Sequence, residues 1–246
     1  MMFYLIVDIG NTSIKLALFN AKTMKHFKQL NKPTLKQVKA FIGSKNIEAC
    51  MLANVSNTHK TIVSYLQSTF STYNISDLRK QKFDFGFINT YKTPLTLGAD
   101  RIANATAAAM LYPTKNVLLI DMGTCLKVDL IIKQKYLGGS ISPGLTMRFK
   151  ALNHFTGQLP LISVTTNYSY PGNNTLTSIQ SGVQKGFFYE TESHINHFKK
   201  LYKPLHIILT GGDSRLFARH TKKHIFADPF FTLKGLYFIL INYLNK

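Results

Sequence analysis

The sequence has no tryptophan and only two cysteines, Cys50 and Cys125. Its apolar start, residues 1–7, is interrupted by Asp8 and has no basic leader, so it does not match a secretory signal peptide. Two cysteines in a chain without an export signal are typical of a reducing compartment, where thiols stay free. We therefore expect a cytoplasmic protein without a disulfide.

Long apolar runs are also missing. No segment reaches the ~18 consecutive apolar residues that a membrane-spanning helix requires. The stretch at residues 230–244 is rich in apolar side chains but contains Lys234 and Gly235, so it predicts a helix packed inside the protein. We expect no membrane partner.

Acidic residues are scarce, because 11 Asp and Glu against 30 Lys and Arg give a formal net charge of +19. Such an excess fits a nucleic acid, a membrane surface or small anionic substrates. The basic residues are spread along the chain, however, and no helix-turn-helix, zinc-finger or RNA-binding aromatic motif accompanies them. We interpret the charge as a solvated basic surface and keep nucleic-acid binding as the alternative.

The sequence does contain a repeated pattern of strands and polar turns. An apolar run, an Asp-x-Gly turn with a hydroxyl-bearing residue and a second apolar run occupy residues 3–19, and the same pattern occupies residues 117–132. A repeat separated by about half the chain predicts an α/β protein with two related lobes. We assign residues 1–113 and 114–246 to these lobes, because Pro113 and its polar neighbours interrupt a predicted helix there.

The first of these turns has groups suited to binding phosphate. Gly10 lets a phosphate approach the backbone because it has no Cβ, and exposed amides and hydroxyls donate hydrogen bonds to phosphate oxygens. Lys15 adds positive charge, and Asp8 at the end of a buried strand is suited to hold a hydrated Mg²⁺. An ordinary hairpin stabilised by its Asp and Asn would explain this segment equally well. The recurrence of the turn at Asp121 favours phosphate binding.

A third turn, residues 209–213, follows an apolar strand and contains two consecutive glycines. A double glycine alone is more often a plain turn than a nucleotide site. In two-lobed ATPases, however, two Asp-x-Gly hairpins clasp the phosphates of ATP and a later glycine-rich turn meets the adenosine. The order of the three turns therefore indicates an ATPase of this kind.

The most specific segment is residues 91–101, which read Tyr-x-x-Pro-x-x-Leu-Gly-x-Asp-Arg before a run of small residues. This pattern resembles the signature of type III pantothenate kinases. Other blocks match in order, among them Gly-Gly-x-Ile-x-Pro-Gly at residues 138–144, Asn-Thr at 174–175 and Leu-Lys-Gly-Leu at 233–236. The resemblance spans nearly the whole chain. It implies an α/β fold with two ribonuclease-H-like lobes of the actin/Hsp70/sugar-kinase type and an active site in the cleft between them.

The resemblance implies an activity and a set of site residues. The reaction is phosphorylation of pantothenate by ATP to 4′-phosphopantothenate, the first step of coenzyme A synthesis. Asp100 is the implied general base, although an Asp at a helix start is more often structural. The implied pantothenate contacts are Tyr91, Gly98, Ala99, Asp100, Arg101 and Thr175. The implied ATP contacts are Asp8, Ile9, Gly10, Asn11, Thr12, Ser13, Ile14, Lys15 and Thr124.

The resemblance also implies cofactors and an assembly. Mg²⁺ accompanies ATP, and a monovalent cation, K⁺ or ammonium, is implied with Asp121 as its ligand. Family members form homodimers, so we expect a homodimer here with the pantothenate site near the subunit interface.

One departure from the family pattern concerns the second hairpin. The family usually has Asp-x-Gly-Thr-x-x-Thr-x-Asp there, and Lys127 stands in place of the last Thr. The change either weakens a phosphate contact or replaces a hydroxyl with an ammonium.

Two other functions also remain open, namely another small-molecule kinase of the same fold and a non-enzymatic relative that binds nucleic acid. The segment at residues 91–101 argues against the former, and the intact Asp8, Asp100 and Asp121 argue against the latter.

Overall fold

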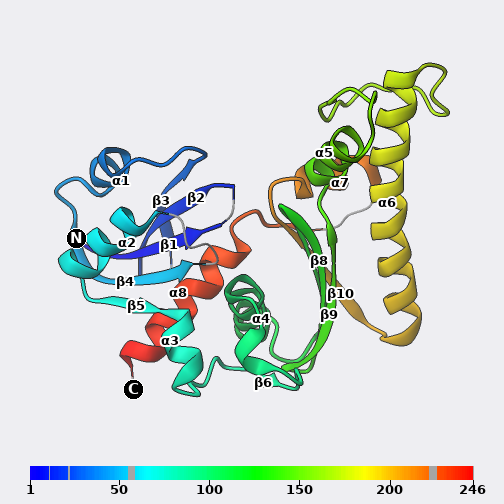
Figure 1. The fold of residues 1–246 in the computed structure, drawn as a ribbon. Helices are drawn as coiled ribbons and strands as arrows, with labels where there is room; N and C mark the ends of the chain where they lie inside the picture. The colour runs from blue at the N-terminus through cyan, green and yellow to red at the C-terminus, as the bar shows by residue number, and fades with distance from the viewer. Residues whose placement is uncertain (11, 22, 55–58, 222–225, 246) are drawn as a thin grey trace. The chain divides into compact units, whose positions relative to one another are not determined.

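The structure is a computed structural model that describes residues 1–10, 12–21, 23–54, 59–221 and 226–245 (Figure 1). The chain forms two compact units. The first comprises Met1–Pro113 together with Phe231–Lys246, and the second comprises Thr114–Phe230. The sequence had assigned the C-terminal segment to the second lobe, so its membership of the first unit differs from that expectation.

The first unit is built on a five-stranded sheet in the order β3-β2-β1-β4-β5. The strands β1, β2 and β3 form an antiparallel meander, whereas β4 runs parallel to β1 and β5 runs parallel to β4. Apolar side chains from β1, β2 and β4 are fully buried, as the near-continuous apolar runs in these strands predict. The elements of this unit are β1 (Met2–Ile9), β2 (Ile14–Asn20), β3 (Thr23–Leu30), α1 (Leu35–Ile42), β4 (Asn46–Asn54), α2 (Lys60–Thr69), β5 (Thr72–Asn74), α3 (Ile75–Lys80), β6 (Ile88–Asn89), the 3₁₀ turn η1 (Pro94–Thr96), α4 (Ala99–Leu111) and α8 (Phe231–Leu244).

The second unit repeats this topology. Its strands run in the order β11-β10-β7-β8-β9, with β7, β8 and β9 antiparallel and with β10 and β11 parallel to β7. The five sheet strands that belong to each unit therefore follow one order, which confirms the two related α/β lobes predicted from the repeated turn. The elements of this unit are β7 (Asn116–Met122), β8 (Cys125–Ile132), β9 (Lys135–Pro143), α5 (Leu145–Phe155), α6 (Thr175–Leu201), β10 (Leu205–Thr210), α7 (Ser214–Thr221) and β11 (Phe226–Ala227).

The helix α8 follows the second unit in the chain but belongs to the first unit, where it packs closely against α4. A Cβ atom on Gly235 would overlap the carbonyl oxygen of Ala103, so glycine is required for the two backbones to approach this closely. The hydroxyl of Thr232 donates a hydrogen bond to the Asn104 side-chain oxygen, 2.9 Å away, and both residues are buried. In Figure 1 the red helix α8 lies beside α4. The small residues of α4 thus serve helix packing.

A polar cluster joins α6 to β9 and α5 in the second unit. The Arg148 guanidinium forms an ion pair with Glu190, and the Ser142 hydroxyl donates a hydrogen bond to Glu190 Oε1 at 2.6 Å. Burial alone would raise the pKa of Glu190, but the hydrogen bonds from Ser142 and Arg148 and the charge of Arg148 lower it below its ordinary value. The long helix is therefore fixed to the sheet by a charged contact as well as by its apolar face.

Within the described part of the chain, no helix is long and apolar enough to cross a membrane.

We predict that Gly235→Ala destabilises the first unit. The added methyl group would force α8 away from α4, and overpacking of this kind costs about 1–3 kcal/mol of unfolding free energy. Gly186→Ala in α6 is the matched control, because a Cβ there meets no atom within 4 Å and should stabilise the helix slightly. Urea unfolding of both variants measures the difference. Equal midpoints for the two variants would contradict the close α4–α8 packing.

Candidate active site

The first predicted phosphate turn connects β1 and β2. Asp8 and Lys15 lie opposite each other in the antiparallel register, and Lys15 Nζ is 3.9 Å from Asp8 Oδ2. The Gly10 amide donates to the Ser13 carbonyl oxygen at 3.0 Å, which closes the turn. Thr12 is exposed within the turn. The carboxylate, the ammonium and the turn hydroxyls therefore gather at one end of the central strand.

The remaining predicted contacts of this turn divide into two kinds. Ile9 and Ile14 are fully buried in the apolar core of the first unit, so only their backbone atoms are available to a ligand. The Ser13 hydroxyl accepts a hydrogen bond from the Gln29 side chain at 3.2 Å. Asn11 lies outside the described residues.

The segment at residues 91–101 leads through η1 into the start of α4. The Arg101 guanidinium is 5.5 Å from the centre of the Tyr91 ring, an arrangement that favours a cation–π interaction. Arg101 is only 4% exposed. The carbonyl oxygen of Leu97 accepts a hydrogen bond from Arg79 Nη1 at 2.5 Å, so α3 holds the chain just before α4. Tyr91 and Arg101, which the family resemblance places in one site, are therefore in contact.

Asp100 lies in the first turn of α4, and its carboxylate folds back on the helix start. Its Oδ1 accepts a hydrogen bond from the Arg101 backbone amide at 2.8 Å, and the helix dipole favours a negative charge there. A Cβ on Gly98 would lie 2.6 Å from this oxygen, so the absence of a side chain at Gly98 makes room for the carboxylate. Ala99 is buried, which leaves Asp100 as the half-exposed acid of the segment.

The second predicted phosphate turn connects β7 and β8. Asp121 and Lys127 are opposite each other in the register, and Lys127 Nζ is 2.7 Å from Asp121 Oδ2. The Gly123 amide donates to the Cys125 carbonyl oxygen at 3.1 Å, and Thr124 is exposed at the tip of the turn. Both hairpins thus carry an Asp with a cross-strand Lys, and the Lys127–Asp121 pair is the shorter of the two.

The third turn lies directly against this second hairpin. The Asp213 amide donates a hydrogen bond to the Met122 carbonyl oxygen at 3.0 Å. Gly211 has a φ of +86°, and a Cβ there would lie 2.5 Å from Met122 and 2.6 Å from Asp121 Oδ1. Burial raises the pKa of the Asp213 carboxyl above its ordinary value. The second hairpin and the double-glycine turn, predicted to act together, are therefore adjacent.

Thr175, the predicted substrate contact in the second unit, occupies the first position of α6. The Asn174 side chain caps the helix by accepting a hydrogen bond from the Thr177 amide at 3.0 Å. Thr175 itself is exposed. The Asn-Thr motif therefore has a structural role as a helix cap, and it presents the Thr175 side chain to solvent.

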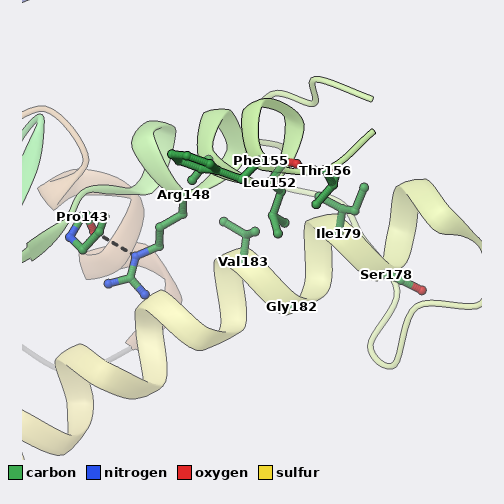
Figure 2. Close-up of a pocket in the computed structure, with 10 residues that line it drawn as sticks. Pro143, Arg148, Leu152, Phe155, Thr156, Ser178, Ile179, Gly182 and Val183 are labelled. Carbon is green, nitrogen blue, oxygen red and sulfur yellow. Dashed lines mark hydrogen bonds between the residues drawn. The ribbon is translucent and has the colours of Figure 1, made fainter. Parts of the chain in front are cut away.

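A cavity of about 510 Å³ lies between α5 and α6 in the second unit (Figure 2). Its walls are mainly apolar and include Leu152, Phe155 and Val183. Arg148 Nε donates to the Pro143 carbonyl oxygen at 2.8 Å on one side of this cavity, as the dashed line in Figure 2 shows. None of the predicted site residues lines it.

Sequence reasoning did not anticipate two contacts that support the site. The buried Asp129 carboxylate accepts a hydrogen bond from the Tyr136 hydroxyl at 2.7 Å, which links β8 to β9 behind the second hairpin. The Lys127–Asp121 pair is the other. Its signal was present in the sequence as the unusual Lys, but the ion pair follows only from the strand register.

Comparison with known proteins agrees with the motifs. The sequence model of the type III pantothenate kinase family matches residues 4–197. A protein named type III pantothenate kinase from Bacteroides fragilis is 38% identical over 242 residues, which cover 98% of each chain. Another protein of that name, from Phocaeicola vulgatus, is 39% identical and covers 96% of this chain and 97% of its own.

Solved structures show the same fold. A Campylobacter jejuni protein, named as a candidate transcriptional activator of the Baf family, superposes with a TM-score of 0.62 at 21% identity and covers 98% of this chain and 100% of its own. A ROK family glucokinase from Streptomyces griseus gives a TM-score of 0.51 at 11% identity, covering 95% of this chain and 97% of its own. Both likenesses bear on the fold alone, which is that of the sugar kinases.

Proposed function

The chain belongs to the type III pantothenate kinase family, and we propose that it phosphorylates the primary hydroxyl of pantothenate with ATP. The products are 4′-phosphopantothenate and ADP, and the reaction is the first step of coenzyme A synthesis. The observation that carries the proposal is the family match over residues 4–197, which includes the Asp8 turn, the Asp100–Arg101 pair and the Asp121 turn. A nucleic-acid-binding regulator is not favoured, because the full-length relatives are named as kinases.

Asp100 is the proposed general base. Phosphoryl transfer needs positioning and charge neutralisation, and a carboxylate beside the attacking hydroxyl accepts its proton. As the new oxygen–phosphorus bond forms, the bond from the γ-phosphorus to the bridging oxygen breaks and ADP leaves. The hydrogen bond from the Arg101 amide to Asp100 Oδ1 supports this role, since it fixes the orientation of the carboxylate.

Separate sets of residues are proposed to contact pantothenate and ATP. Pantothenate carries a carboxylate, and the buried guanidinium of Arg101 beside Tyr91 is suited to an anionic substrate. The further proposed pantothenate contacts are Gly98, Ala99 and Thr175. The proposed ATP contacts are the turn from Asp8 to Lys15 and Thr124.

Mg²⁺ is proposed to bind with ATP near Asp8. Mg²⁺ is usually held by one or two carboxylates together with substrate phosphates and water, and Asp8 is a carboxylate at the phosphate turn. The described residues contain no group of three or more His, Cys, Asp or Glu side chains that could hold a metal. When bound, the ion neutralises phosphate charge.

Unlike Mg²⁺ at Asp8, a monovalent cation at Asp121 does not fit the residues present. The Lys127 ammonium lies 2.7 Å from Asp121 Oδ2, and both side chains are largely buried. A K⁺ ion at this carboxylate would have to displace the ammonium. No step of the proposed reaction is therefore assigned to such an ion.

ADP release from the purified protein with ATP, Mg²⁺ and pantothenate tests the proposal. We expect turnover that requires pantothenate, measured in K⁺ buffer by a coupled assay. Replacing pantothenate with sugars or acetate tests the other small-molecule kinases. Turnover with one of these and none with pantothenate would overturn the proposed substrate.

We predict that Asp100→Asn keeps the fold and ATP binding but loses turnover by about 10²–10⁴-fold, the usual contribution of a general base. Asp77→Asn is the matched control, because Asp77 is an exposed acid in the first turn of α3. Steady-state kinetics give turnover, and calorimetry with a non-hydrolysable ATP analogue gives binding. Undiminished turnover in Asp100→Asn would remove Asp100 from its role as base.

A homodimer is also proposed, as the family resemblance implies. The second unit exposes large apolar side chains near the start of α6 and the end of α5, and Phe155 is 82% exposed. Surfaces of this kind often mark protein interfaces.

A cytoplasmic location is proposed as well, and two free cysteines support it.

We predict that light scattering after size exclusion gives twice the chain mass of 27.8 kDa. Phe155→Asp should shift the protein towards monomer, since it places a charge on the apolar surface. Phe27→Asp, at another exposed aromatic position, serves as the control. A monomeric wild-type protein at assay concentrations would contradict the proposed dimer.

A further inference from the structure

The ion pair between Lys127 and Asp121 sits where the second phosphate turn begins. The two residues face each other across β7 and β8, and Nζ lies 2.7 Å from Oδ2. The side chains are only 14% and 9% exposed. The pair is therefore a short, charge-assisted hydrogen bond that is largely removed from solvent.

The other oxygen of the Asp121 carboxylate is held against two backbone turns. A Cβ on Gly211 would lie 2.6 Å from Oδ1, and a Cβ on Gly123 would lie 3.4 Å from it. The carboxylate thus fits between the hairpin turn and the double-glycine turn. Its position is fixed by the backbone on one side and by the Lys127 ammonium on the other.

The first hairpin gives an internal comparison. Lys15 Nζ is 3.9 Å from Asp8 Oδ2, and the Lys15 side chain is 25% exposed. This looser and more exposed pair leaves Lys15 able to move towards an incoming phosphate. The Lys127–Asp121 distance is shorter, and the Lys127 side chain is more deeply buried than that of Lys15. This arrangement suits a charge that stays in place.

We propose that the Lys127 ammonium is a built-in monovalent cation of the phosphate site and makes the enzyme independent of K⁺. This inference rests on the proposed kinase function and deepens it. A lysine ammonium carries the same unit charge as K⁺, and a buried carboxylate without a cation is strongly unfavourable. Because Lys127 is covalently attached, it neutralises Asp121 at any salt composition and supplies a positive charge beside the phosphates.

The proposal predicts a gain of cation dependence when the lysine is removed. In Lys127→Thr the Asp121 carboxylate loses its ammonium, and the site gains a hydroxyl oxygen that suits K⁺. We expect turnover and ATP-analogue affinity to fall by about 10-fold to 100-fold in choline chloride, as for the loss of one charged hydrogen bond, and to recover in KCl. The wild-type protein should show the same values in choline chloride and KCl of equal ionic strength.

Two controls separate this effect from a general loss of charge or fold. Lys135→Thr removes the same charge from an exposed position of β9 and should remain independent of K⁺. Lys127→Arg keeps the positive charge and should also remain independent of K⁺. A readout without turnover is the thermal unfolding midpoint, which K⁺ should raise specifically in Lys127→Thr.

The outcomes are distinct. K⁺-dependent turnover or analogue binding in the wild-type protein would overturn the proposal, and so would a folded Lys127→Thr that is fully active in choline chloride. If Lys127→Thr does not fold, the wild-type comparison still decides the question. Absence of turnover in every salt would refute the proposed reaction instead, and analogue binding, which needs no pantothenate, would still test the role of Lys127.

Discussion

The close approach of three backbone turns around Asp121 is the constraint on which the second unit's site depends. A Cβ at Gly211 would lie 2.6 Å from the Asp121 carboxylate, and a Cβ at Gly144 would overlap the carbonyl oxygens of Gly123 and Thr124. The turns after β7, β9 and β10 can therefore meet only without side chains at these positions. Because each turn ends a strand of one sheet, the sheet fixes their mutual positions, and the carboxylate, amides and hydroxyls between them are preorganised.

Much of the fold could be predicted from the sequence because its signals are local. Apolar runs that end in Asp-x-Gly predicted two strand–turn–strand units, and the five sheet strands that belong to each unit follow the same order. The packing of α8 on the first unit could not be predicted. Its apolar residues indicate burial but carry no information about which surface covers them. The partner of Gly235 is the carbonyl oxygen of Ala103, more than a hundred residues earlier in the chain, and no local pattern reveals that contact.

Most residues of the candidate site could also be predicted, but one of their pairings could not. The Asp-x-Gly turns and the Asp100–Arg101 segment carry distinctive residue types, so their candidates followed from the sequence and from the family resemblance. The sequence showed Lys127 only as a departure from the family's Thr. Its pairing with Asp121 could not be predicted, because the partner depends on the number of residues in the turn. Met122 pairs with Leu126, which leaves a three-residue turn and places Lys127 opposite Asp121. The first hairpin has a four-residue turn between Ile9 and Ile14, so the same geometry there requires a Lys one position later relative to its Asp.

The two hairpins therefore place one kind of pair in two different electrostatic settings. Lys15 is partly solvated and only loosely held by Asp8, so its interaction with a ligand competes with water. Lys127 is buried against a carboxylate that the backbone fixes, so most of its desolvation occurs during folding rather than on nucleotide binding. An ammonium has three donors, and it can bridge a carboxylate and a phosphate oxygen where a threonine hydroxyl offers a single donor. A covalently attached cation does not exchange with ions in solution as a bound ion does. Its charge is therefore present whatever salt surrounds the protein.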